Sequence, residues 1–411
     1  MYQIVWKLSS IVFSSSENLG VIGSYFKLLT KMIRNHGIIY TVKLLKMMRL
    51  HCTKYICGEP FFVNDLKIGV DKTGWPKKLD FLKPLAKGSI YDKKLLLTIL
   101  LLSRTLTLKE KEKSLLKPNY STIIGRSTQY KFIPNGFLNK FVKKFRLRRK
   151  PPVFSLSNLY LSNKAGPHGK ATLTASKAKY TYLELVELSR LSSGTKGLDF
   201  LLSSYRFFAR KLNKSFENDV KHYSKGKISF VYDPECKLRL IAIVDYYTQL
   251  FLKPIHDIVL NLLKSLPQDR TFTQDPKNLW EDNGHKFWSL DLSSATDRFP
   301  IELQARLLSK VFGSNDLAVS WRKVLSGREF LTPEGDYIRY ECGQPMGSYS
   351  SWVSFTLAHH AMVHFCASLC GIKDFNQYII LGDDIVIKHD DVARMYIKWC
   401  KRLGVELSLQ K

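Results

Sequence analysis

Two short segments in the C-terminal third of the chain carry aspartates beside predicted β-strands. In residues 286–300 (KFWSLDLSSATDRFP), an apolar strand predicted over 287–290 ends at Asp291, and Asp297 follows six positions later. A carboxylate at a strand end can hold a hard divalent cation such as Mg²⁺. Asp297 should lie in the following turn or at the start of a helix, where an aspartate can also serve as an N-cap.

The second acidic segment, residues 377–390 (QYIILGDDIVIKHD), has two apolar runs on either side of Gly382, Asp383 and Asp384. Glycine followed by acidic residues between two strand-like runs predicts a β-hairpin. Two adjacent carboxylates at a tight turn repel each other unless a cation lies there. The turn is therefore a candidate metal site, although an Asp-containing hairpin is also a common structural turn.

A loop rich in glycine and serine lies between the two acidic segments. Residues 341–355 (ECGQPMGSYSSWVSF) lead into an apolar helix predicted over 350–370. Exposed N–H groups and hydroxyls at the start of a helix can bind phosphate or ribose, but the same residues could serve only as caps of the helix. The candidate binding residues here are Gly343, Gly347, Ser348 and Ser351.

Farther upstream, residues 236–245 (CKLRLIAIVD) predict an apolar strand that begins with two cations. Because side chains alternate along a strand, Lys237 and Arg239 should lie on the same face. The pair could clamp a triphosphate, or the face could simply be exposed to solvent.

The chain is strongly basic, and the whole excess lies in its first 280 residues. The formal net charge is +29 over 411 residues, yet residues 281–411 hold 16 acidic and 15 basic side chains. Such an excess usually persists because a polyanion neutralises it, so RNA, DNA and an anionic membrane surface are the candidate partners. Hydrophobic residues make up 45% of the chain, which excludes disorder as its overall description.

The most basic stretch is residues 139–150 (NKFVKKFRLRRK), which interleaves Phe141 and Phe145 with seven Lys and Arg residues. Aromatic side chains between cations suit stacking on single-stranded bases, while a solvated basic face is an equal alternative. The candidate RNA-binding residues in this stretch are Lys143, Lys144, Arg146, Arg148 and Arg149.

The N-terminal residues 1–58 predict amphipathic helix, most clearly over 41–50 (TVKLLKMMRL). The apolar side could contact a membrane surface or pack onto the rest of the protein. The longest apolar run, residues 95–102 (LLLTILLL), is too short to cross a bilayer and predicts a buried helix. The seven cysteines do not indicate a disulfide framework in so long a chain.

Taken in order, these segments resemble the mitovirus RNA-dependent RNA polymerases, which are relatives of the narnavirus and RNA-phage replicases. The similarity lies in DLSSATDRFP, GQPMGSYSSW and LGDD, and in AGPHGK (165–170) and DRTFTQD (269–275). It covers roughly residues 160–411.

The resemblance implies an α+β fold, the right-hand polymerase, with helical, basic fingers around an antiparallel palm sheet. The strand 287–290 should lie beside the hairpin 378–387, with the helix 350–370 behind them. Three regions are expected: 1–160 (basic helical fingers), 161–280 (fingers with the Lys-x-Arg strand) and 281–411 (palm). Family members continue into a thumb, so we expect this chain to be C-terminally truncated, with an incomplete palm and no thumb.

The resemblance also implies a mechanism, two-metal nucleotidyl transfer that replicates a viral RNA genome. Asp291, Asp383 and Asp384 would hold two Mg²⁺ (or Mn²⁺) ions, which requires Asp291 to lie within about 10 Å of the turn. RNA template, RNA product and ribonucleoside triphosphates are the implied partners, and the mitochondrion is the implied location. The expected nucleotide contacts are Lys237 and Arg239 to the triphosphate, Asp297 to the ribose hydroxyls, and Ser348 and Ser351 to the 2′-hydroxyl.

Two alternatives remain open. An organellar reverse transcriptase or maturase is also basic and palm-based, but such enzymes usually carry an aromatic-x-Asp-Asp hairpin, whereas Leu381 and Gly382 precede the acids here. An inactive RNA-binding remnant of an integrated viral polymerase would keep the motifs without the activity.

Overall fold

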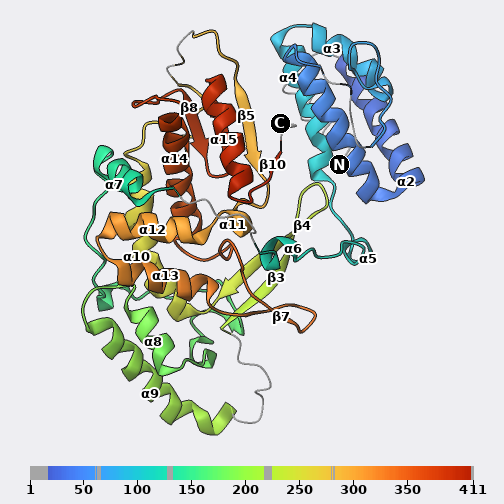
Figure 1. Cartoon of the computed structure of the whole chain (residues 1–411). Helices are drawn as coiled ribbons and strands as arrows, with labels where there is room; N and C mark the ends of the chain where they lie inside the picture. The colour runs from blue at the N-terminus through green and yellow to red at the C-terminus, as the bar shows by residue number, and fades with distance from the viewer. Residues whose placement is uncertain are drawn as a thin grey trace. The chain divides into compact units, whose positions relative to one another are not determined.

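The chain forms two compact units, each with its own hydrophobic core. The computed structural model describes residues 17–60, 62, 66–126, 133–216, 225–278, 280 and 283–408 (Figure 1). The first unit comprises residues 1–118 and 230–239, and the second comprises residues 119–229 and 240–411. The boundaries between these units differ from the boundaries between the three regions expected from the sequence. The assignment of those regions to fingers and palm stays a prediction.

The first unit is helical. Its longest element, α2, is divided at Gly37, whose φ of 73° is not helical. Its apolar side chains, among them Tyr25 and Met48, are buried with those of α4 in one core, so packing within the unit occupies this face. None of the described helices is long and apolar enough to cross a membrane. The helical elements are α2 (Glu17–Ile56), η1 (Lys77–Leu82), α3 (Lys83–Lys87), α4 (Ile90–Leu101), η2 (Leu102–Thr105) and α5 (Glu110–Lys113).

The apolar run 95–102 is helical as predicted, and most of it is buried. Residues 95–101 lie in α4, where Leu95, Leu96, Ile99 and Leu100 are buried, whereas Leu101 is exposed and Leu102 begins η2. Ser89 caps this helix with a reciprocal capping box to Asp92, which satisfies two N–H groups at the helix start.

In the second unit, helices surround a small central sheet. Helix α14 is the central one: it is buried on nearly every side and packs against α10, α12, α15 and α7. The α-helices of this unit are α6 (Ser121–Ile124), α7 (Asn135–Lys144), α8 (Tyr182–Ser189), α9 (Lys196–Phe216), α10 (Tyr246–Leu263), α11 (Ala295–Arg298), α12 (Ile301–Phe312), α13 (Asn315–Ser326), α14 (Ser351–Leu369) and α15 (Asp390–Arg402).

The central sheet has the strand order β10-β5-β9-β8, and all three pairings are antiparallel. The prediction that the strand near Asp291 lies beside the hairpin 378–387 is confirmed. β5 (Trp288–Leu292) pairs with β9 (Asp384–Ile387), which in turn pairs with β8 (Tyr378–Leu381). The fourth strand, β10 (Leu407–Ser408), is not predicted by the sequence. Helices α14 and α15 lie beside this sheet in Figure 1 and contact β8 and β9, respectively.

A second sheet has the order β4-β3-β6-β7. Its strands are β3 (Gly226–Asp233), β4 (Lys237–Val244), β6 (Phe330–Leu331) and β7 (Tyr337–Ile338), and the AGPHGK segment forms a two-stranded ribbon of β1 (Ala165–Gly166) and β2 (Gly169–Lys170). The predicted Lys-x-Arg strand is therefore observed as β4.

Candidate active site

Asp291 and Asp384 lie directly opposite each other on neighbouring strands of the central sheet. The register of β5 and β9 pairs their Cα atoms, which places the two carboxylates on one face of the sheet, since directly paired residues share a face. Paired Cα atoms are about 4.5–5.5 Å apart, so the requirement that Asp291 lie within about 10 Å of the Gly-Asp-Asp turn is met. On its other side, Asp291 is paired with Ser408 of β10.

Alternation along the strands explains why these carboxylates reach the open face. Leu290, Leu292, Ile385 and Ile387 are buried, and they alternate with the positions of the two aspartates. A strand has a side-chain period of two, so burying the apolar set fixes Asp291 and Asp384 on the other face.

The turn that carries Asp383 depends on glycine at position 382. Gly382 has φ of 62°, in the left-handed region that glycine adopts without strain. A Cβ at this position would also lie 2.7 Å from Nε1 of Trp352 on helix α14. The turn is therefore packed directly on this helix.

His359, two helical turns beyond Trp352, holds the same turn by a hydrogen bond. Its Nδ1 lies 2.9 Å from the carbonyl oxygen of Gly382, and its Nε2 lies 2.7 Å from the hydroxyl of Tyr396 on α15. A carbonyl can only accept, so Nδ1 donates; in the neutral ring Nε2 then accepts from Tyr396. Burial lowers the pKa of His359 to about 3, which keeps the ring neutral.

The carboxylates of Asp291 and Asp384 are oxygen ligands that fit a hard divalent cation. Two like charges directly opposite each other on a sheet destabilise it, and a bound cation would remove that repulsion. No three His, Cys, Asp or Glu side chains gather into a metal-binding group among the described residues. Mg²⁺ usually takes only one or two carboxylates from a protein and completes its shell with waters and substrate phosphates, so a pair with Asp383 beside it suits this ion.

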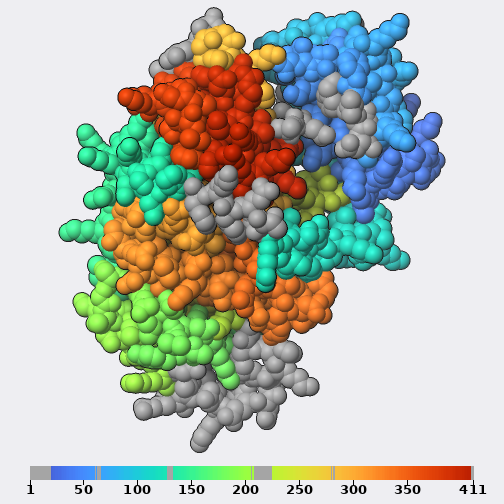
Figure 2. All heavy atoms as spheres, in the orientation of Figure 1, coloured from blue at the N-terminus to red at the C-terminus, as the bar shows by residue number. Residues whose placement is uncertain are grey.

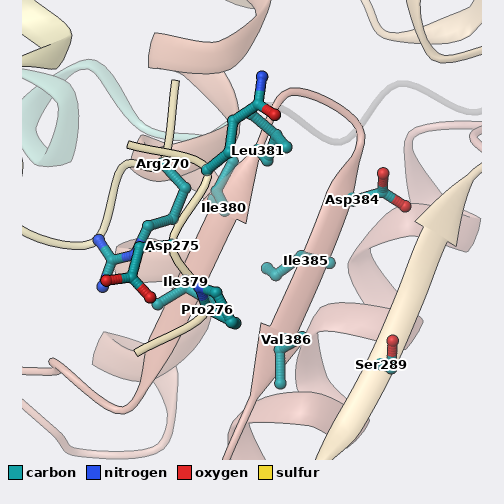
Figure 3. A pocket seen from close by; sticks show the side chains of 11 residues that line it. Arg270, Asp275, Pro276, Ser289, Ile379, Ile380, Leu381, Asp384, Ile385 and Val386 are labelled. Carbon is teal, nitrogen blue, oxygen red and sulfur yellow. The ribbon is translucent and has the colours of Figure 1, made fainter. Parts of the chain in front are cut away.

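A groove runs along the open face of the sheet and has Asp384 among its lining residues (Figure 3). In Figure 3, Asp384 lies on β9 on the side of β5, and the apolar Ile379 and Val386 line the groove. The DRTFTQD segment forms one wall, where Arg270 donates its guanidinium hydrogens to the backbone carbonyls of Pro267, Asp269 and Lys277. These hydrogen bonds fix the shape of the loop.

Asp297 lies against the glycine-rich loop. Gly343 donates its N–H to the carbonyl of Asp297 at 2.9 Å, and a Cβ at Gly343 would collide with the backbone of Thr296 and Asp297. Only glycine allows this approach. The loop and the strand-end segment, separated in sequence, are thus brought together as one site.

Several polar atoms around this contact are enclosed and have no hydrogen-bond partner among the described residues. They include Oδ1 of Asp297 and the hydroxyl oxygens of Ser348 and Ser351. The other carboxylate oxygen of Asp297 accepts a hydrogen bond of 2.8 Å from the hydroxyl of Thr122. Burial raises the pKa of Asp297 to about 6, against the lowering effect of Thr122. Buried polar atoms are normally paired, so such atoms indicate a place for a polar ligand.

Strand β4 joins this region through its C-terminal half. Ala242 donates its N–H to the carbonyl of Met346 at 2.9 Å, next to Gly347, whose φ is 105°. Lys237 and Arg239, at the other end of β4, belong to the first unit, and there Arg239 is ion-paired with Asp233.

The basic stretch 139–150 presents its cations to solvent but not its aromatic rings. Phe141 is buried, and both Phe141 and Phe145 pack against His364, so a solvated basic face is observed instead of a stacking platform. Lys144 is ion-paired with Asp374 at 2.8 Å, and Arg149 donates to backbone carbonyls. Figure 2 shows this segment in green at the surface, beside the orange of α12, which α7 contacts. Lys143, Lys144, Arg146, Arg148 and Arg149 are all exposed.

Thr122 and His359 were not predicted from the sequence as residues of this site. Thr122 lies far upstream of the motifs, and His359 was predicted only as part of an apolar helix. Trp352 ends the GQPMGSYSSW segment, but its contact with the turn was not predicted. A pair spaced seven residues apart on a predicted helix shares one face, which is the one signal that could have linked Trp352 with His359.

Comparison with known proteins agrees with the arrangement of these parts. The family described as mitovirus RNA-dependent RNA polymerase matches residues 152–411. The RNA-directed RNA polymerase of Cryphonectria parasitica mitovirus 1 is 35% identical over 342 residues, which is 77% of this chain and 40% of that polymerase.

Two uncharacterized mitochondrial proteins of Arabidopsis thaliana are also similar. One is 35% identical over 157 residues, covering 36% of this chain and 76% of its own length. The other is 34% identical over 158 residues, covering 36% of this chain and 63% of its own length. The family match covers more than half of this chain, which therefore belongs to the mitovirus RNA-dependent RNA polymerases.

Proposed function

We propose that this chain supplies the palm and adjoining fingers of an enzyme that extends RNA on an RNA template. The observation that carries the proposal is the direct opposition of Asp291 and Asp384, with Asp383 at the adjoining turn. Membership of the polymerase family supports the same reaction. The chain spans 40% of the length of its viral relative, so the proposal concerns the part that this chain contributes to the reaction.

Asp291, Asp383 and Asp384 would hold two Mg²⁺ or Mn²⁺ ions at the edge of the central sheet. When bound, such ions lower the pKa of the attacking 3′-hydroxyl and neutralise charge on the leaving pyrophosphate. The chain itself would position the aspartates, because Trp352 and His359 of α14 hold the turn at Gly382 in place. Charge that is positioned before the reaction is the main source of catalysis in phosphoryl transfer.

The incoming ribonucleotide would lie between the sheet edge and the glycine-rich loop. Asp297, Ser348 and Ser351 present enclosed oxygens that have no partner in the part of the chain that the structure describes, and a ribose offers hydroxyls that can donate to them. Lys237 and Arg239 belong to the first unit; they are proposed as triphosphate-binding residues on the basis of the family resemblance, and Arg239 must leave Asp233 to bind a phosphate. Gly343 and Gly347, which pack against the backbones of Asp297 and Ala242, would place the backbone of the loop beside the RNA.

The exposed basic stretch 139–150 would hold the RNA backbone through charge, without reading its sequence. A mitochondrial location is part of the proposal, because the viral relative is a mitovirus polymerase and two other relatives are named as mitochondrial proteins. The reverse transcriptase alternative is not favoured, since the matching family and the viral relative are RNA-directed RNA polymerases.

The decisive experiment is metal-dependent incorporation of a ribonucleotide on a primed RNA template by the whole chain and its Asp383→Ala variant. We expect Asp383→Ala to abolish incorporation while RNA binding, measured by filter retention, stays within about twofold. Asp316→Ala, which changes an exposed aspartate on α13, is the matched control and should keep full activity. Equal incorporation by wild type and Asp383→Ala would refute the proposed role of this turn.

A further inference from the structure

A short segment upstream of the family match is fastened to the candidate nucleotide site by three hydrogen bonds. The Thr122 hydroxyl donates to Oδ2 of Asp297 at 2.8 Å, and the Arg298 guanidinium donates to the carbonyl of Gly125 at 2.5 Å. The N–H of Glu341 donates to the carbonyl of Ile123 at 3.0 Å. Residues 121–126 are thereby tied both to the strand-end segment and to the start of the glycine-rich loop.

The two oxygens of the Asp297 carboxylate differ in their surroundings. Oδ2 is occupied by Thr122, whereas Oδ1 is enclosed and has no partner in the described structure. Leaving a buried carboxylate oxygen unpaired is costly, so Oδ1 is set to accept a hydrogen bond from a ligand. A carboxylate that accepts from a fixed donor on one oxygen cannot rotate freely, and the direction of the other oxygen is then defined.

We propose that Thr122 is a positioning residue that determines ribonucleotide specificity, by holding Asp297 so that Oδ1 accepts a hydrogen bond from a ribose hydroxyl. The inference rests on the proposed function, and it adds a residue that lies outside the matched region 152–411. A site built to pair a hydroxyl rejects the analogue that lacks it, because its own buried polar atom is then left unpaired. A 2′-deoxyribonucleotide lacks the 2′-hydroxyl and would leave Oδ1 of Asp297 buried and unpaired.

The test compares Thr122→Val, which keeps the shape but removes the donor, with Thr122→Ser, which keeps the hydroxyl. The measured quantity is the ratio of kcat/KM for ATP to kcat/KM for dATP on a primed RNA template with the whole chain. We expect Thr122→Val to lower this ratio by about tenfold or more, as the loss of a hydrogen bond to a charged group implies, and Thr122→Ser to stay within about twofold. Most of the change should appear in KM for ATP.

Thr98→Val is the matched control, because the Thr98 hydroxyl donates to the backbone carbonyl of Lys94 on an exposed part of α4. It should leave the ratio unchanged. A Thr122→Val ratio equal to that of wild type would overturn the inference. So would tighter ATP binding by Thr122→Val, because it would show that Thr122 competes with the nucleotide for Asp297.

Equilibrium binding of ATP and dATP, measured by calorimetry without primer, decides the inference even if the chain incorporates neither nucleotide. A preference for ATP that is present in wild type and Thr122→Ser and absent in Thr122→Val supports it. A preference that Thr122→Val retains, or one that wild type lacks, refutes it. Failure of incorporation with this binding pattern intact would count against the proposed reaction alone.

Discussion

The Nδ1 atom of His359 donates a hydrogen bond of 2.9 Å to the carbonyl oxygen of Gly382. This bond joins the most buried helix of the second unit to the turn that carries Asp383. On the other side of the ring, Tyr396 of α15 completes the connection. Burial is the main cause that raises the pKa of Tyr396, and the charge of Asp291 is a lesser one, so this network also lies close to the opposing strand.

We expect His359→Gln to loosen the turn and His359→Asn to preserve it. The amide nitrogen of asparagine lies near the position of Nδ1, so it can still donate to Gly382, whereas that of glutamine lies near Nε2 and cannot. Amide hydrogen exchange of the peptide that spans 381–385 should become about tenfold or more faster in His359→Gln, because one net hydrogen bond is lost. In His359→Asn the exchange rate should increase by less. His364→Gln, on the same helix but without a bond to the turn, is the control. Equal exchange in both His359 variants would contradict this role.

The stability of the second unit should fall as the pH rises through about 6, because of Asp297. Its pKa is raised from 3.8 to about 6 by burial, so the folded state binds the proton more tightly than the unfolded state does. The resulting stabilisation is complete below about pH 4 and is lost above about pH 6, and it amounts to at most about 3 kcal/mol.

Asp297→Asn removes this titration. The melting temperature of the variant, relative to that of wild type, should therefore rise between pH 5 and pH 8. Asp316→Asn, which changes an exposed aspartate, should run parallel to wild type over the same range. A difference between Asp297→Asn and wild type that stays constant with pH would show that Asp297 does not titrate in this interval.

Gly343→Ala should destabilise the second unit by about 3 kcal/mol, because the added Cβ would enter the backbone of Thr296 and Asp297 and overpacking of this kind forces the chain to shift. Urea unfolding, followed by tryptophan fluorescence, measures the change. Gly136→Ala is the matched control: its Cβ would meet no atom within 4 Å, so it should cost nothing and could gain about 1 kcal/mol within α7. Similar midpoints for the two variants would refute the close approach at Gly343.

Local patterns in the sequence were sufficient for the elements that carry the motifs. The hairpin around Gly382 and the helix after Ser350 follow from turn chemistry and from the length of apolar runs, which are properties of neighbouring residues. The strand that ends near Asp291 was predicted over 287–290, and the structure extends it to Leu292. The opposition of Asp291 and Asp384 was expected only through resemblance to a family, since nothing local links residues so far apart.

Tertiary structure alone decided the register, the extra strand and the supporting residues. β10 is a two-residue strand that exists because its backbone pairs with β5, and so short a segment has no periodicity to detect. Thr122 and His359 reach the site by hydrogen bonds to residues that are 175 and 23 positions away, and no propensity or spacing encodes such a partner. The sequence by itself thus determined which chemistry the chain carries, while packing determined which atoms meet, because contacts between distant segments depend on how every buried face is covered at once.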